Sequence, residues 1–230
     1  MYPTLLTVGP FSLSTYGVLS AAGYAAAITW LSRRREAMGL SEEKFWSLVY
    51  WLFGGILIGA KLAYALVERD ITVLWRDPRY GFVFYGGVAG AAVAGLIARK
   101  RLGLDYRRCA DYFAAAMPLG HAIGRLGCLG AGCCFGSHTD LPWGLPMAGD
   151  PSRHPVQLYE AGLNLGLFFV AAYILLPRRL PVFRIVVAAY AVIRFALEFL
   201  RDDPRGAGLA GLSPSQLFAL VALLLVWRLK

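Results

Sequence analysis

The sequence predicts an all-α membrane protein with about seven transmembrane helices. Of its 230 residues, 58% are hydrophobic and only 16% are charged, whereas about 25% are charged in an average soluble domain. The mean hydropathy is +0.55. Because a helix needs about 20 mostly apolar residues to cross a bilayer, roughly seven spans with short loops use up the chain. We therefore expect residues 1–230 to form a single membrane domain.

The expected spans follow from the apolar segments of the sequence. They are 11–31, 45–67, 83–98, 110–131, 157–176, 182–200 and 211–229. The first span lacks the basic start of a secretory signal, so we expect it to be permanent. The fourth span is the least regular, because it contains Pro118 and is rich in glycine. These residues favour a broken or re-entrant segment there.

Basic residues predict the orientation of the chain. They are concentrated in the loops after the first, third and fifth spans and at the C-terminus. By the positive-inside rule, the N-terminus lies outside and the C-terminus is cytoplasmic. The net charge of +9 is then explained by topology and by attraction to anionic lipid headgroups. Nothing resembles a nucleic-acid-binding module, and the loop region 137–153 on the outer face is short.

Charged residues inside the expected spans are the first candidates for function. Lys61, Arg125 and Arg194 each cost about 2.5–3.5 kcal/mol at the centre of a membrane helix, so each should face a partner or a wet cavity. Arg194 and Glu198 are four residues apart and can pair on one helical face. Arg125 has no acid at helical spacing in its own span. Its partner is therefore Glu160, Glu198 or a ligand phosphate, which suits the guanidinium fork.

A polar segment, "RHPVQLYEA", opens the fifth expected span. Arg153, Gln157, Tyr159 and Glu160 place polar groups on the first turns of an otherwise apolar helix. Tyrosine and arginine at this level are common membrane anchors. Their concentration at one outer-face opening favours a binding site.

The segment "GRLGCLGAGCCFG" holds three of the four cysteines, Cys128, Cys133 and Cys134. The spacing C-x4-C-C differs from that of a zinc ribbon, and adjacent cysteines seldom both reach one tetrahedral ion, so we predict neither a metal nor another cofactor. A disulfide from Cys128 to Cys133 or Cys134, or thiol redox chemistry, are alternatives. A further alternative is that these small residues only let helices pack closely.

His121 lies four residues before Arg125 and seven before Cys128. If the segment is helical, the three share one face. A histidine beside a cysteine can generate a nucleophilic thiolate. The alternative is that His121 only bonds a neighbouring carbonyl.

Six segments, in this order and spacing, resemble the prolipoprotein diacylglyceryl transferases. They are "VGPFSLSTYGVL", "GAKLAYAL", "FYGGVAG", "GRLGCLGAGCCFG", "RHPVQLYE" and "IRFALEFLR". The resemblance implies a multi-pass protein of the bacterial inner membrane with its site toward the outer face. It also implies transfer of a diacylglyceryl group from phosphatidylglycerol to the cysteine thiol of a lipoprotein precursor, with release of glycerol phosphate.

By this resemblance, Arg125 and Arg194 match the arginines that bind phosphate and take part in catalysis in the family. Other polar positions of the family's site are matched by Tyr16, Arg153, Glu160 and Glu198. Together with the residues above, we predict two sets of site residues. The catalytic set is Arg125, Arg194, His121, Cys128 and Tyr85, and the substrate-binding set is Tyr16, Gly86, Gly87, Arg153, Gln157, Tyr159, Glu160, Glu198, Cys133 and Cys134.

Three departures from the family pattern concern the reaction itself. Tyr85 replaces the family's histidine before Gly86 and Gly87, and a tyrosine is a poor proton acceptor at neutral pH, so it is better suited to orienting a headgroup. Cys128 replaces an asparagine and Cys133 an acidic residue. The outer loop is shorter than the family's periplasmic head. The acceptor thiol therefore belongs either to a lipoprotein precursor or to Cys128 itself.

Two functions of other classes remain as alternatives. One is a membrane thiol-redox or thiol-handling protein on the same fold without lipid transfer. The other is a transporter or channel, which has less support because the polar residues cluster at one outer end and do not line the whole membrane.

Overall fold

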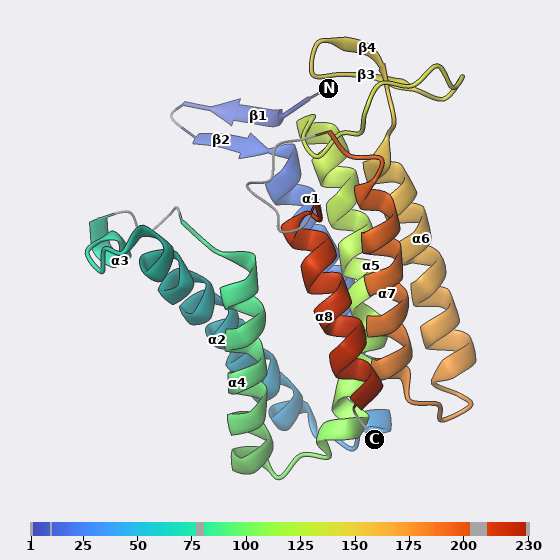
Figure 1. Cartoon of the computed structure of the whole chain (residues 1–230). Coiled ribbons are helices and arrows are strands. Elements are labelled where there is room, and N and C mark those ends of the chain that lie inside the picture. Colours follow the sequence, from blue (N-terminus) through green and yellow to red (C-terminus); the bar gives the residue numbers. More distant parts are fainter. Residues whose placement is uncertain (1, 10, 77–80, 203–210, 229–230) are drawn as a thin grey trace. The chain divides into compact units, whose positions relative to one another are not determined.

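The computed structural model describes residues 2–9, 11–76, 81–202 and 211–228. The structure is mostly helical (Figure 1). The chain divides into two compact units. The first contains residues 1–31 and 110–230, and the second contains residues 32–109.

The second unit is built on two long helices, α2 (Glu42–Glu68) and α4 (Phe84–Leu102), with the short helices η1 (Glu36–Met38) and α3 (Val73–Arg76). Helix α2 begins where the Ser41 hydroxyl accepts a hydrogen bond from the Lys44 amide at 3.3 Å, which satisfies one of the free N–H groups of its first turn. Helix α4 ends at Gly103, whose φ of 63° is the left-handed conformation that glycine adopts without strain.

Glycines bring α2 and α4 into close backbone contact. Gly55 and Gly59 on α2 lie against Gly86 and Gly90 on α4, and a Cβ added to any of the four would meet backbone of the other helix. Both pairs have the spacing of small residues that lets two helices approach closely in a membrane. Gly86, a predicted substrate-binding residue, therefore also has a packing role.

We expect Gly90→Ala to destabilise this helix pair. The new methyl group would meet the Gly55 carbonyl, and overpacking of this kind costs about 1–3 kcal/mol. Gly54→Ala is the matched control, because a Cβ there meets nothing within 4 Å. Thermal unfolding in detergent measures the difference, and equal melting temperatures for the two variants would contradict the close contact.

The described residues of the first unit form a bundle of five long helices with two hairpins. The helices are α1 (Thr15–Ser32), α5 (Tyr106–Ala131), α6 (Val156–Val170), α7 (Val182–Glu198) and α8 (Pro214–Arg228), with α6 continued by one π-helical segment, η2 (Ala171–Leu175). The antiparallel hairpins β1–β2 (Thr4–Val8, Phe11–Ser14) and β3–β4 (Leu145–Met147, Asp150–Arg153) lie at the end where α5 stops and α6 starts (Figure 1).

The helices agree with the sequence prediction except at two places. Each of the seven expected spans contains one long helix, but residues 11–14 form a strand, so the first helix begins at Thr15. The expectation of a broken or re-entrant fourth segment is wrong, because α5 runs unbroken through Pro118. One proline removes a single backbone hydrogen bond, and prolines are tolerated within membrane helices that pack against their neighbours.

Among the residues that the structure describes, two helical segments are long and apolar enough to cross a membrane by length and composition, Glu42–Glu68 and Val156–Leu175. Pro214–Arg228 is a shorter apolar helix. The count of seven spans and the orientation of the termini remain predictions.

Candidate active site

A buried polar cluster joins α5 to α6. One carboxylate oxygen of Glu160 pairs with Nη2 of Arg125, and the other lies 2.9 Å from Nε2 of His121. Glu160 is 1% exposed and Arg125 is 8% exposed, so the ion pair is almost completely removed from water. The hydroxyl of Tyr190 on α7 lies 3.4 Å from the same His121 nitrogen. The prediction that Arg125 takes its partner from another helix is confirmed.

The spacing on α5 explains why these groups meet. Because the helix is continuous, His121, Arg125 and Cys128 lie at i, i+4 and i+7 and share one face, as predicted. Arg125 bonds to Glu160 through Nη2 and donates from Nη1 to Cys128 Sγ at 3.6 Å. One guanidinium therefore links the carboxylate of α6 to a thiol of its own helix.

Two buried amides on α6 support this cluster. Asn164 donates to the Glu160 carbonyl at 2.8 Å, and Gln157 donates to the Cys133 carbonyl at 2.7 Å. Both side chains are 0% exposed. Gln157, predicted to bind substrate, thus holds the loop that carries Cys133. Asn164 was not predicted, because a single asparagine in an apolar segment forms no motif.

A second ionic cluster lies at the junction of α7 and α8. Arg194 pairs with Glu198 at 2.7 Å, as the spacing predicted, and also donates to the Ser215 hydroxyl at 3.1 Å. Ser213 donates to the other oxygen of Glu198 at 2.7 Å. The two serines were missed, because serines at a helix start are common caps and carry no specific signal.

Arg125 and Arg194 each retain one buried N–H group without a hydrogen bond. Among the residues that the structure describes, neither Nε of Arg125 nor Nη1 of Arg194 has an acceptor. A buried donor left unpaired costs about 1–3 kcal/mol. Both groups would gain by contact with an anion.

Arg153 lies among the outer loops. Its Nη1 donates to the Gly136 carbonyl at 3.0 Å and to Asp202 at 2.7 Å, and its guanidinium lies 4.8 Å from the centre of the Phe135 ring. These contacts tie the segment after α5 to the segment after α7.

The predicted residues Tyr159 and Tyr16 occupy different surroundings. Tyr159 accepts from the Trp143 indole at 2.8 Å and lies 3.3 Å from His154, so it joins the outer loop to α6. Tyr16 is 50% exposed on α1, and its backbone lies against Gly127 of α5.

The loop 137–153, predicted as a short outer region, carries a histidine–carboxylate pair. His138 Nδ1 lies 3.0 Å from Asp150, and this hydrogen bond raises the pKa of His138 above its usual value. The pair is therefore strongest when His138 is protonated, and it weakens as the pH rises through that raised pKa.

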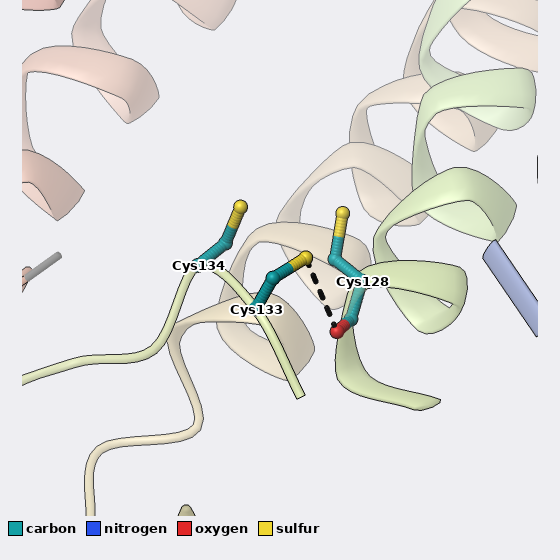
Figure 2. Close-up of side chains that lie close together, drawn as sticks. All are labelled: Cys128, Cys133 and Cys134. Atoms are coloured by element: carbon teal, nitrogen blue, oxygen red, sulfur yellow. Dashed lines mark hydrogen bonds between the residues drawn. The ribbon is translucent and has the colours of Figure 1, made fainter. Parts of the chain in front are cut away.

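Three cysteine sulfurs converge at the end of α5. The Sγ atoms of Cys128, Cys133 and Cys134 all lie within 4.8 Å of one another, and Figure 2 shows the three side chains close together. None of the three forms a disulfide in this structure. Adjacent cysteines seldom both approach one point, but here both sulfurs lie close to Cys128. The φ of Cys134 is 65°, a left-handed conformation that turns the chain between the two side chains.

Three predicted site residues belong to the second unit. Tyr85 and Gly86 lie in the first turn of α4, where Tyr85 is 37% exposed. Gly87 is buried next to Ile56 and Ala60 of α2. Lys61, the third charged residue expected within a span, lies 5.3 Å from the centre of the Phe82 ring and 5.6 Å from that of Tyr64.

Apolar helices around two arginine–glutamate clusters fit a helical membrane enzyme. The chain belongs to the prolipoprotein diacylglyceryl transferase family, whose family model matches residues 3–229. It is 32% identical to the phosphatidylglycerol–prolipoprotein diacylglyceryl transferase of Clostridium tetani, over 98% of this chain and 95% of that protein. Proteins of the same name from Vibrio vulnificus and Methylococcus capsulatus are each 33% identical, over 91% and 86% of this chain and 82% and 81% of theirs.

Proposed function

We propose that this protein transfers a diacylglyceryl group from phosphatidylglycerol to a cysteine thiol of a lipoprotein precursor. The substrates are those in the names of its relatives. We further propose that its seven long helices cross the bacterial inner membrane, with the N-terminus and the site toward the outer face and the C-terminus in the cytoplasm.

The unpaired donors of two buried arginines are the observation that carries this proposal. Arg125 pairs with Glu160 and Arg194 with Glu198, and each arginine keeps a buried N–H group that has no acceptor among the described residues. A buried donor without an acceptor is costly, and a lipid phosphate would satisfy both. The free N–H groups of Arg125 and Arg194 would be its first donors.

The arrangement fits a displacement at the glycerol carbon. The thiol sulfur of the acceptor forms a bond to that carbon while the bond from carbon to phosphate oxygen breaks, and glycerol phosphate leaves with the electron pair. Negative charge grows on the leaving phosphate, where fixed guanidinium groups stabilise it more than they stabilise the intact lipid. His121, oriented by Glu160, accepts the thiol proton.

A transfer assay with labelled phosphatidylglycerol and a lipobox peptide tests this function. We expect label on the peptide thiol and released glycerol phosphate. Absence of both products from folded protein in bilayers would contradict the proposal. Intact-mass analysis without peptide asks whether Cys128 itself accepts the group, and an unchanged mass assigns the acceptor to the peptide.

We expect Arg194→Ala to lower transfer about ten- to a hundredfold, since a hydrogen bond to a charged group contributes about 1.5–3 kcal/mol. Arg76→Ala is the control, because Arg76 is 72% exposed and remote in sequence from the cluster. Equal rates for the two variants would exclude Arg194 from phosphate binding.

The topology has its own test. Green fluorescent protein fused after Lys230 should fluoresce, because it folds in the cytoplasm. Alkaline phosphatase fused at the same place should be inactive, because it cannot form its disulfides there. The reverse pattern would show that the orientation is inverted.

A further inference from the structure

We propose that Cys128, Cys133 and Cys134 bind one zinc ion, whose fourth position takes the thiol of the acceptor as a thiolate. This inference rests on the proposed function, because it assigns to the cysteines the activation of that thiol. It concerns a site in which three sulfur ligands meet at the end of α5 (Figure 2).

The distances suit a single thiophilic ion. The three Sγ atoms lie within 4.8 Å of one another. A Zn–S bond is about 2.3 Å long, so two sulfurs on a tetrahedral zinc lie about 3.8 Å apart. Shifts of well under 1 Å per sulfur, within the range of small side-chain rotations, would complete the coordination.

The backbone after α5 is shaped so that these side chains meet. Helix α5 ends as Gly132 takes a φ of 73° and Cys134 a φ of 65°, and the Cys133 amide bonds back to the Cys128 carbonyl at 3.1 Å. A non-glycine residue with positive φ is uncommon and is held there by its surroundings. The strained turn is what lets two consecutive cysteines reach the third.

The surroundings supply charge and support. Arg125 Nη1 donates to Cys128 Sγ at 3.6 Å, and Arg125 and Arg201 both interact electrostatically with Cys134. These guanidinium groups offset the negative charge that three zinc-bound thiolates bring. Gln157 bonds the Cys133 carbonyl and so restrains the loop, as outer groups around a metal site commonly do.

The three cysteines differ in their exposure to solvent. Cys128 is 6% exposed, whereas Cys133 is exposed. An open hollow of about 550 Å³ is lined by Ala131 and Gly132, next to Cys133 in the chain, and by the β3–β4 hairpin. Three protein ligands with an open fourth position are the arrangement of catalytic zinc rather than of structural zinc. An approaching peptide thiol could occupy that position.

Bound zinc would make the acceptor thiol a better nucleophile by favouring loss of its proton. A thiol that coordinates a metal cation loses its proton, and metal coordination is one of the ways proteins activate a nucleophile. The acceptor thiol would bind zinc and release its proton to His121. The sulfur then forms the bond to the glycerol carbon, the carbon–oxygen bond to phosphate breaks, and the product thioether leaves the metal. Zinc keeps its oxidation state, so no oxidant or reductant is needed.

Metal analysis of the purified protein tests the site without any assay of activity. Protein prepared in detergent without chelator should contain about one zinc per chain. After replacement by cobalt it should show the sulfur-to-cobalt charge-transfer absorption of thiolate ligands. Cys133→Ser and Cys134→Ser should each lower zinc affinity at least about tenfold, since even changes outside the ligand shell cost 10–100-fold. Cys109→Ser is the control and should leave zinc binding unchanged, because Cys109 lies near the start of α5, at the opposite end of the helix from Cys128.

Several results would overturn the inference. One is the absence of zinc in folded protein that also fails to take it up. Another is equal zinc affinity in the Cys133→Ser, Cys134→Ser and Cys109→Ser variants. A third is a mass 2 Da below that of the thiol form under the same conditions, because a disulfide would occupy the ligands. Copper(I) bound by the three sulfurs with no affinity for zinc would also contradict it.

A second measurement separates this inference from the proposed function. Removal of zinc by a chelator should abolish transfer to the lipobox peptide, and zinc but not magnesium should restore it. If transfer proceeds without bound zinc, the zinc inference fails and the transferase stands. If zinc binds with cysteine dependence but no preparation transfers lipid, the metal site stands while the proposed function and the acceptor role of the zinc fail.

Discussion

Arg125→Met should lower diacylglyceryl transfer about 10²–10³-fold, the range found when one donor to a developing negative charge is removed. Among the described residues, the side chains of Arg125 and His121 both bond to the Glu160 carboxylate. Arg125 also keeps an Nε without an acceptor, which could donate to the lipid phosphate. The rate with labelled phosphatidylglycerol and a lipobox peptide measures the effect.

Stability must be separated from catalysis in this variant. Breaking a buried ion pair by removing one partner destabilises a protein by about 3–5 kcal/mol, and Glu160 would be left buried and unpaired. The double variant Arg125→Met with Glu160→Gln removes that charge and should recover most of the melting temperature. It should remain inactive. A double variant that regains activity together with stability would show that Arg125 serves folding alone.

The helices could be read from the sequence because their signals are local. Long apolar runs fix where each helix lies, and all seven were found. The pairing of Arg194 with Glu198 also followed, since a charge in an apolar helix requires a partner. For Arg125 the sequence left Glu160, Glu198 or a ligand phosphate open, and Glu160 is the partner observed.

Other features depend on contacts that no sequence spacing encodes. The continuity of α5 through Pro118, whose side chain is fully buried, depends on packing against the other helices. The meeting of Cys133 and Cys134 with Cys128 depends on two positive φ angles, and only one of these falls on a glycine. Tyr190 reaches His121 from a different helix. Each is set by tertiary packing, which overrides local propensity.

The role of His121 gives the other large expected effect. His121→Gln should lower the catalytic rate about 10²–10⁴-fold, the contribution typical of a positioned proton acceptor. Glutamine can still hydrogen-bond to Glu160, so the fold and the affinity for the lipid should change little. Tyr190→Phe is the matched control, because it removes the longer 3.4 Å contact to His121 and leaves the imidazole in place, so it should cost less than about tenfold, the effect of one net hydrogen bond.

Chemical rescue distinguishes proton transfer from a purely structural role. The His121 side chain is 31% exposed, so the space left by His121→Ala is open to a small molecule. Added imidazole should restore part of the rate in that variant and leave Arg125→Met unchanged, because it replaces the lost proton acceptor but not the lost guanidinium. If imidazole has no effect on His121→Ala while the melting temperature of that variant has fallen, then His121 serves to hold α5 against α6, and the thiol proton goes to another group.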